Sequence, residues 1–207
     1  MIIQDVSQRT LDWAKMHVGI PTASGFHNLL TPEFKIKEGE GPKTYLYTKI
    51  AEKFYGEPVL DISTFSIEQG EILENEAKPF FELETGRQIQ NVGFIHTDDW
   101  KTGCSPDGLL EDDNGLEIKC PSAHYHVKYL VEGRLPKEYA AQVHGSMYVT
   151  GRPRWTFMSY RRNFPPFILE VERNEEFMER IAEAIDRFIQ MRDLAMMALW
   201  KIQNESR

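Results

Sequence analysis

Two acids and a lysine stand close together in the stretch GCSPDGLLEDDNGLEIKCP, residues 103–121. Asp107 precedes Glu117, and Lys119 follows Glu117 two positions later. Side chains alternate between the two faces of a β-strand, so Glu117 and Lys119 share one face and the apolar residues of LEIKC share the other. We therefore expect the charged pair to project from one side of a strand.

The segment DDNG, residues 112–115, has the residue types of a tight hairpin turn. A hairpin there would pair the strand of Glu117 with the preceding strand and bring Asp107 next to Glu117. Two carboxylates this close repel each other unless a cation lies between them, and oxygen ligands suit Mg²⁺ or Mn²⁺. A lysine beside such an ion can orient a metal-bound water, favour its deprotonation and stabilise negative charge growing on a phosphate.

The Glu-x-Lys pattern alone is weak evidence, because the chain contains it three times. The copy that begins at Glu33 lies in an expected loop. The copy that begins at Glu76 lies on an expected helix, where positions two apart do not face each other. Only the copy at Glu117 lies on a strand behind a Pro-Asp-Gly turn. An exposed ion pair, worth ~0 to 1 kcal/mol and without function, is the alternative to a catalytic role.

The elements that must position these residues follow from hydrophobic periodicity. Apolar residues at helical spacing predict helices over 7–17, 19–30, 44–56, 66–86, 136–151 and from 174 towards 200. Alternating patterns predict strands within 89–100, 102–121, 154–162 and 166–173. This order of elements predicts an α/β sandwich.

Capping residues mark several of the expected helix ends. We expect Ser7 to cap the first helix and Asn174 the last, while Gly56 ends the helix over 44–56. Thr22 and Ser24 carry hydroxyls that can either cap the second helix or hold an anion near its N-terminus.

Length and composition limit the classes of protein that fit. With 207 residues, 41% of them hydrophobic, we expect a single domain over residues 1–207. The 24 basic and 32 acidic residues give a net charge of −8, which argues against a protein that coats nucleic acid through bulk positive charge. The two cysteines form neither a CxxC pair nor a disulfide scaffold. Since no segment looks like a signal peptide or offers the ~18 apolar residues of a membrane span, we expect a soluble cytoplasmic protein.

Several motifs resemble one known family. CSPDGL, NGLEIKCP and YAAQVHGSMYVTG together look like the λ-exonuclease (YqaJ-like) branch of the PD-(D/E)xK nucleases, which are viral recombinases of phages and prophages. VGIPTASGFHNLL is similar to the N-terminal segment of this family, and GEILENEAKPFFELETG to its acidic helix. The resemblance runs from about His17 to Glu172 in the order of the family. It implies a restriction-endonuclease-like α/β core, with a central mixed β-sheet flanked by helices.

The resemblance also assigns a metal site. It implies that Asp107 and Glu117 bind the catalytic Mg²⁺, with Mn²⁺ as the other suitable ion, and that the backbone carbonyl of Ile118 is a further ligand. Two ions per site would be held in this way. Lys119 would activate the attacking water. Glu74 matches the glutamate of the acidic helix, which adds a carboxylate to the metal cluster.

The remaining matches concern the DNA strand. Gln142 matches a glutamine that contacts the scissile region or the terminal phosphate, and Ser24 and Ser105 match hydroxyls close to the phosphate pocket. A turn or cap role for each serine stays open. Arg161 belongs to the stretch RPRWTFMSYRR, residues 152–162, which is either a DNA-contacting surface or an ordinary exposed basic strand.

One position departs from the family pattern. His17 stands where family members carry an arginine, and a histidine lacks the bidentate fork with which arginine holds a phosphate. A 5′-phosphorylated end would then be bound more weakly, or Lys15 or Arg9 would bind the phosphate instead. His124 and His126 form an H-x-H pair, but no third ligand at suitable spacing supports a metal site, so we expect turn or surface residues.

The resemblance implies an enzyme that binds the ends of duplex DNA, hydrolyses one strand from its 5′ end to mononucleotides and leaves a 3′ single-stranded tail. It further implies a ring-shaped homotrimer, a single-strand annealing protein as partner, and the cytoplasm of a bacterial host of a phage or prophage. A structure-specific or restriction-type endonuclease on the same fold is one alternative. A non-enzymatic DNA-end-binding module is another, although it should have lost the metal ligands. The iron–sulfur nucleases of this superfamily need four cysteines, and the chain has two. A two-carboxylate glycosidase would leave Lys119 without an obvious role.

Overall fold

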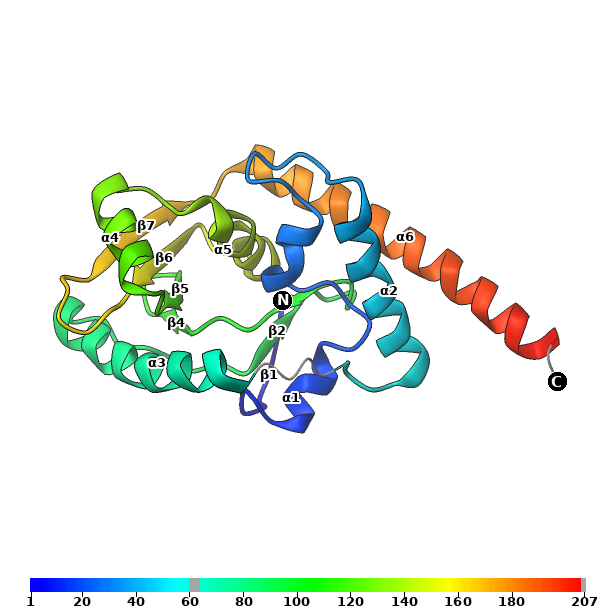
Figure 1. Cartoon of the computed structure of the whole chain (residues 1–207), viewed down its shortest axis with the longest axis horizontal. Helices are drawn as coiled ribbons and strands as arrows, with labels where there is room; N and C mark the ends of the chain where they lie inside the picture. The colour runs from blue at the N-terminus through cyan, green and yellow to red at the C-terminus, as the bar shows by residue number, and fades with distance from the viewer. Residues whose placement is uncertain (60–63, 206–207) are drawn as a thin grey trace.

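The structure is a computed structural model that describes residues 1–59 and 64–205, without the side chains of residues 64–72 and Glu74. Helices and strands follow one another in blocks along the chain (Figure 1). The elements are, in order, β1 (Ile2–Gln4), α1 (Leu11–Met16), the 3₁₀ helix η1 (Ala23–Asn28), α2 (Glu40–Tyr55), α3 (Thr64–Thr85), β2 (Phe94–His96), β3 (Gly103–Cys104), β4 (Gly108–Leu110), β5 (Asn114–Lys119), α4 (Ala123–Glu132), α5 (Lys137–Thr150), β6 (Arg154–Ser159), β7 (Phe167–Glu172) and α6 (Glu175–Glu205).

Two sheets form the β-structure of the described chain. The larger has the order β4-β5-β6-β7, in which β5 and β6 run parallel and the outer pairs run antiparallel. The smaller has the order β1-β2-β3 and is antiparallel throughout. The larger sheet is therefore mixed, and helices flank it, which confirms the predicted α/β fold class.

Each face of the larger sheet packs against a different helix. Leu116 and Ile118 of β5 join Ala77 and Phe81 of α3 in one buried cluster. The opposite face carries the main core, where residues of α5, η1, α2 and α6 meet those of β6. Because side chains alternate along β5, Glu117 points away from α3, and its side chain contacts α5. The predicted alternation of LEIKC is confirmed.

The turn between β4 and β5 is a tight hairpin, as predicted, but it precedes the predicted position, because Asn114 and Gly115 of DDNG already belong to β5. Leu110 pairs with Asn114, and residues 111–113 form the turn, with Asp113 at φ 59°. Gly115 lies under Trp155, whose ring would stand 2.2 Å from an added Cβ atom, so only glycine fits. Arg152 fixes the hairpin from outside, because its Nη1 donates to the carbonyls of Leu110 (3.1 Å) and Asn114 (2.8 Å).

The long helix α6 lies beside α2 and extends beyond the rest of the molecule at its C-terminal end (Figure 1). Its N-terminus is capped as predicted, since Asn174 Oδ1 accepts from the backbone N–H of Phe177 at 3.2 Å. Gly56, at φ 77°, caps the C-terminus of α2, also as predicted. α2 itself begins at Glu40, four residues before the predicted start at residue 44.

The N-terminal third differs most from the predictions. Thr10, and not Ser7, caps α1, since Thr10 Oγ1 accepts from the N–H of Trp13 at 3.3 Å. The expected helix over 19–30 is the 3₁₀ helix η1, at whose N-terminus Thr22 makes no side-chain capping bond. β1 was not predicted, because a three-residue, exposed edge strand leaves almost no pattern.

α4 was not predicted either. Its buried residues are His126 and Tyr129, while Tyr125, Val127 and Val131 are exposed. Val127, Leu130 and Val131 stand at helical spacing, so the sequence does carry a periodic signal here, but Val127 and Val131 are exposed and the buried positions hold a histidine and a tyrosine.

Candidate active site

The hairpin places Asp107 directly beside β5. The backbone N–H of Asp107 donates to the carbonyl of Leu116 at 3.1 Å, and the N–H of Ile118 donates to Asp107 Oδ2 at 2.6 Å. The Asp107 carboxylate is thus held by the backbone that carries Glu117. Both acids line one pocket of about 270 Å³. The expectation that the hairpin brings them together is confirmed.

Glu117 is an acid buried among polar partners, with 3% of its side chain exposed. One of its oxygens, Oε1, lies 2.6 Å from Lys119 Nζ and 2.6 Å from Gln142 Nε2. A buried carboxylate is costly unless it is paired and hydrogen-bonded, and Glu117 has both kinds of partner. Its carboxylate is therefore fixed from β5 and from α5 at the same time.

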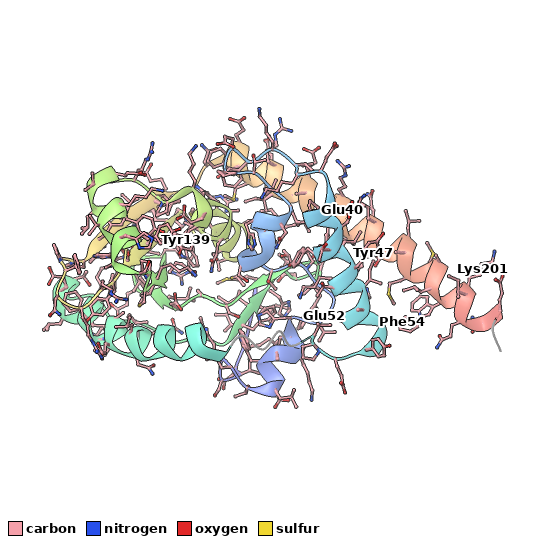
Figure 2. All side chains as sticks on the ribbon, viewed as in Figure 1. Glu40, Tyr47, Glu52, Phe54, Tyr139 and Lys201 are labelled. Atoms are coloured by element: carbon pink, nitrogen blue, oxygen red, sulfur yellow. The ribbon has the colours of Figure 1, made fainter. Side chains whose placement is uncertain are left out.

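Lys119 places a cation beside the carboxylates of Glu117 and Asp107. Its side chain is 26% exposed, and Nζ lies 5.2 Å from the centre of the Tyr139 ring, one turn before Gln142 on α5. Figure 2 labels Tyr139 beside the sheet. Burial alone would lower the pKa of Lys119, but the negative charges of Glu117 and Asp107 outweigh burial and raise it above its ordinary value. Lys119 is therefore an ammonium group that faces two carboxylates.

The opposite wall of the pocket consists of α1 and the segment before β4. Ser105 Oγ accepts from Trp13 Nε1 at 2.8 Å and lies 3.3 Å from His17 Nε2. The His17 ring packs between those of Trp13 (4.3 Å between centres) and Phe94 (4.6 Å). Burial lowers the pKa of His17, the charge of Lys49 lowers it further, and the hydrogen bond to the Trp13 carbonyl opposes both. At neutral pH the imidazole is therefore uncharged.

The helix η1 brings Ser24 to the same pocket, where it is exposed. Its Oγ lies 3.3 Å from Thr22 Oγ1. η1 packs closely on α5 at Gly145, where an added Cβ atom would lie 2.5 Å from the Phe26 ring. Cys104 also lines the pocket, but burial and the charge of Glu117 raise its pKa, so it is a thiol and not a thiolate ligand.

Not every predicted residue reaches the pocket. Arg9 lines it, whereas Lys15 is exposed and forms an ion pair with Asp12 at 3.6 Å. Arg161 is not among its described lining residues, since its Nη1 donates to the Pro121 carbonyl at 3.4 Å, just beyond the end of β5. Glu74 belongs to α3, but its side chain lies outside the described part of the structure.

The stretch over residues 152–162 makes most of its described contacts within the protein. Trp155 is fully buried in the core, so it offers no surface for base stacking. Arg152 binds the hairpin backbone, Arg154 pairs with Glu170, and Arg162 pairs with Glu76. These three arginines therefore have partners within the protein.

The two histidines of the H-x-H pair do not meet. His124 is exposed, whereas His126 is fully buried, so the prediction of turn or surface residues is wrong for His126. His126 Nδ1 lies 2.7 Å from Ser159 Oγ, and Nε2 lies 3.0 Å from the Pro165 carbonyl. It therefore joins α4 to the sheet and to the following loop.

Three residues of the site were not recognised from sequence. Trp13 holds Ser105, Tyr139 lies against Lys119, and Gln8 Nε2 donates to the Pro106 carbonyl at 2.9 Å, beside Asp107. Trp13 stands one helical turn before His17, and Tyr139 one turn before Gln142. This spacing is a signal from which both could have been found. Gln8 lies in irregular chain and has no such signal.

The donor set suits a hard divalent cation. Asp107 and Glu117 line the pocket with carboxylate oxygens, a ligand type that Mg²⁺ and Mn²⁺ prefer. Among the described side chains, no group of three or more His, Cys, Asp or Glu comes together. The described carboxylates of the pocket are thus a pair, with a lysine beside them.

A mixed sheet with an aspartate, a buried glutamate and a lysine on one hairpin defines the class of the protein as a nuclease of the PD-(D/E)xK type. Residues 12–153 match the model of the YqaJ-like viral recombinase domain. The chain therefore belongs to this family, and it is a DNA nuclease. No described helix is both long and apolar enough to cross a membrane.

Solved structures agree with this family. The alkaline exonuclease LHK-Exo from Laribacter hongkongensis is 25% identical, with a TM-score of 0.85 over 96% of this chain and 100% of that one. A crystal structure of LHK-Exo in complex with dAMP is 26% identical, with a TM-score of 0.87 and the same coverage. A phage-related exonuclease from Haemophilus somnus 129PT shares the fold at 12% identity, with a TM-score of 0.70 over 90% of this chain and 99% of that one. Among curated proteins no sequence matches the chain.

Proposed function

We propose that the protein is a divalent-metal-dependent exonuclease that degrades one strand of duplex DNA from its 5′ end, releases 5′-mononucleotides and leaves a 3′ single-stranded tail. One observation carries the proposal. Asp107, Glu117 and Lys119 lie on one hairpin in a pocket whose opposite wall bears the hydroxyls of Ser24 and Ser105. Carboxylates and a lysine suit hydrolysis of a phosphodiester, and the hydroxyls suit the binding of a terminal phosphate.

The carboxylate side of the pocket is the metal site of this proposal. Asp107, Glu117 and the carbonyl of Ile118 would hold Mg²⁺ or Mn²⁺, and Glu74 from α3 would add a carboxylate for a second ion. When bound, such an ion supplies an acidified water and neutralises charge on the phosphate. The chain's own part is to hold these oxygens in place before DNA arrives, through the N–H of Ile118 and the side chain of Gln142.

Lys119 and Gln142 have separate roles in the reaction. The Lys119 ammonium, held 2.6 Å from Glu117, would orient the attacking water and stabilise negative charge on the phosphate in the transition state. Gln142 donates to the same Glu117 oxygen from α5, so it orients the carboxylate and stands near the scissile phosphate. Removal of Gln142 would leave Glu117 with one fewer donor in a buried site.

The hydroxyl side of the pocket would hold the 5′ end. Ser24 and Ser105 would donate to the terminal phosphate, and neutral His17, whose one N–H donates from Nδ1 to the Trp13 carbonyl, would lie with its unprotonated Nε2 3.3 Å from Ser105 Oγ and position that serine. Arg9 lines the same pocket and is the candidate for the cation that the family arginine provides elsewhere. Arg161, beyond the end of β5, would contact the DNA backbone outside the pocket.

The wider setting follows the family. The whole chain, residues 1–207, would act as one nuclease domain, assemble as a homotrimer around DNA, and cooperate with a single-strand annealing protein in recombination. It would work in the cytoplasm of a bacterium that carries the phage or prophage. LHK-Exo, which the chain resembles, was crystallised with dAMP, a mononucleotide of the kind expected here as product.

The test uses linear duplex DNA labelled separately at its 5′ and 3′ ends, together with a closed circular duplex, each with Mg²⁺ and with EDTA. We expect the 5′ label to appear first, as mononucleotide, only with Mg²⁺ and only from linear DNA. Lys128→Ala serves as control, because Lys128 is a half-exposed lysine on α4 outside the pocket. Cutting of the circle would identify an endonuclease, and retarded but intact linear DNA a binding module.

A further inference from the structure

Behind the wall formed by residues 17–24 lies a cluster of charged side chains that are buried. Lys49 and Glu52 on α2 are 7% and 5% exposed, and Arg192 on α6 is 6% exposed. Charged residues are rarely this buried, because removal from water is costly unless partners compensate. The partners of these three residues therefore indicate their purpose.

Each of the three side chains binds the backbone of one short segment, residues 17–19. Lys49 Nζ donates to the His17 carbonyl at 3.2 Å and to Glu52 Oε2 at 2.8 Å. The same Glu52 oxygen accepts from the N–H of Gly19 at 3.0 Å. Arg192 Nη1 donates to the Gly19 carbonyl at 2.6 Å. Figure 2 labels Glu52 on α2, the helix that lies beside α6.

The segment also runs too close to α2 for any residue but glycine at position 19. Gly19 has φ +70°, and an added Cβ atom would lie 2.6 Å from Lys53 Cβ. A little further on, the N–H of Thr22 donates to the hydroxyl of Tyr45, again on α2, at 3.2 Å. The backbone between His17 and Ser24 is thus attached to α2 at both ends.

We propose that Lys49, Glu52 and Arg192 are positioning residues of the 5′-end pocket. They hold the backbone of residues 17–19 so that the His17 ring stands against Ser105 and the Ser24 hydroxyl faces the pocket where the terminal phosphate would bind. The inference rests on the proposed function and extends it from the pocket to α2 and α6. None of the three residues lines the pocket.

Energetic considerations favour a positioning role for the Lys49–Glu52 ion pair over a role in stability. A buried ion pair is often no more stabilising than two apolar residues of similar volume, because desolvation offsets the attraction of the charges. Its hydrogen bonds, however, fix the orientation of the backbone groups that they bind, which apolar contacts do not. A site that must match a phosphate within a fraction of an ångström needs this kind of support.

The decisive variant is the double substitution Lys49→Met with Glu52→Met. It removes both charges together and conserves volume, so it leaves no single buried charge unpaired. Lys49→Arg is the conservative variant that keeps a cation at the site. Lys43→Met is the matched control, because Lys43 lies on the same helix in an exposed ion pair with Glu40 at 2.9 Å.

The readouts are kcat and KM for linear duplexes with 5′-phosphate and with 5′-hydroxyl ends, together with thermal unfolding. We expect the double variant to fold, to raise KM for phosphorylated ends about tenfold and to change kcat less than about threefold, as for the loss of a binding contact. Its preference for phosphorylated ends should fall by the same factor. Lys49→Arg should recover most of this loss, and Lys43→Met should behave as wild type.

The outcomes separate the inference from the function. Absence of Mg²⁺-dependent end degradation by the wild type would refute the proposed function itself. An active wild type with a folded double variant of unchanged KM and end preference would refute only the positioning role. A double variant that cannot fold would overturn it too, because the pair would then serve the fold.

Discussion

His144 on α5 gives a sharp test of how the core around the active site responds to acid. It is 5% exposed and lies edge-on against the rings of Phe34 (5.3 Å between centres) and Phe177 (5.0 Å). In the described part of the chain its Nδ1 has no hydrogen-bond partner. Burial lowers the pKa of His144 from 6.5 to about 4. The folded protein therefore keeps this histidine neutral.

The sign of the pH effect follows from linkage. Below pH 6.5 the unfolded chain binds a proton at His144 that the folded chain does not bind until about pH 4, so acid favours unfolding. The contribution of neutral His144 to the free energy of unfolding is fully present above pH 6.5 and is lost as the pH falls towards 4. At ~1.4 kcal/mol for each pH unit, the loss is about 2 kcal/mol at pH 5 and about 3 kcal/mol below pH 4.

The perturbation is His144→Met, which has similar volume and cannot be protonated. We expect wild type and variant to differ by less than about 1.5 kcal/mol in unfolding free energy at pH 8. At pH 5 the variant should gain about 2 kcal/mol relative to the wild type. Urea unfolding at both pH values measures this difference, and exposed His124→Met is the control. A difference between wild type and His144→Met that is independent of pH would refute the reasoning.

Three further outcomes are expected. Lys119→Ala should abolish cleavage while DNA binding and thermal unfolding stay as in the wild type, and substantial turnover by this variant would contradict the role of Lys119. Gly145→Ala should cost about 1 to 3 kcal/mol in urea unfolding, because its Cβ atom would lie 2.5 Å from the Phe26 ring, whereas alanine in an open helix position gains ~0.5 to 1 kcal/mol. For the proposed homotrimer, Trp200→Glu on the projecting and half-exposed end of α6 should lower the mass measured by light scattering without changing the circular dichroism. An unchanged mass would exclude that end of α6 from the subunit contact.

The centre of the site is the part that sequence predicts well. Strand alternation and hairpin chemistry are local properties, and they placed Asp107 beside Glu117 and put Lys119 on the same strand face. The helix caps at Gly56 and Asn174 are local as well. Such features depend on neighbours within a few residues, so their signal survives in the sequence.

The periphery of the site could not be predicted in this way. Ser105 meets Trp13 across 92 positions of sequence, and Lys49 meets the His17 carbonyl across 32, so neither contact has a local pattern. Buried polar residues add a second difficulty. His126 was expected at the surface and is buried, and Lys49 and Glu52 are buried polar residues of α2, whereas periodicity treats every polar side chain as exposed.

The position of Gln142 connects the core of the protein with its chemistry. Gln142 reaches Glu117 from α5, and the same helix carries His144 into the core and meets η1 at Gly145. A displacement of α5 would therefore lengthen the 2.6 Å contact to the Glu117 carboxylate and shift Ser24 on η1 at the same time. Because a displaced donor acts on the reacting site as well as on stability, Gly145→Ala should lower kcat for DNA ends in a protein that is still folded. A loss of stability with unchanged kcat would mean that the sheet alone holds Glu117 in place.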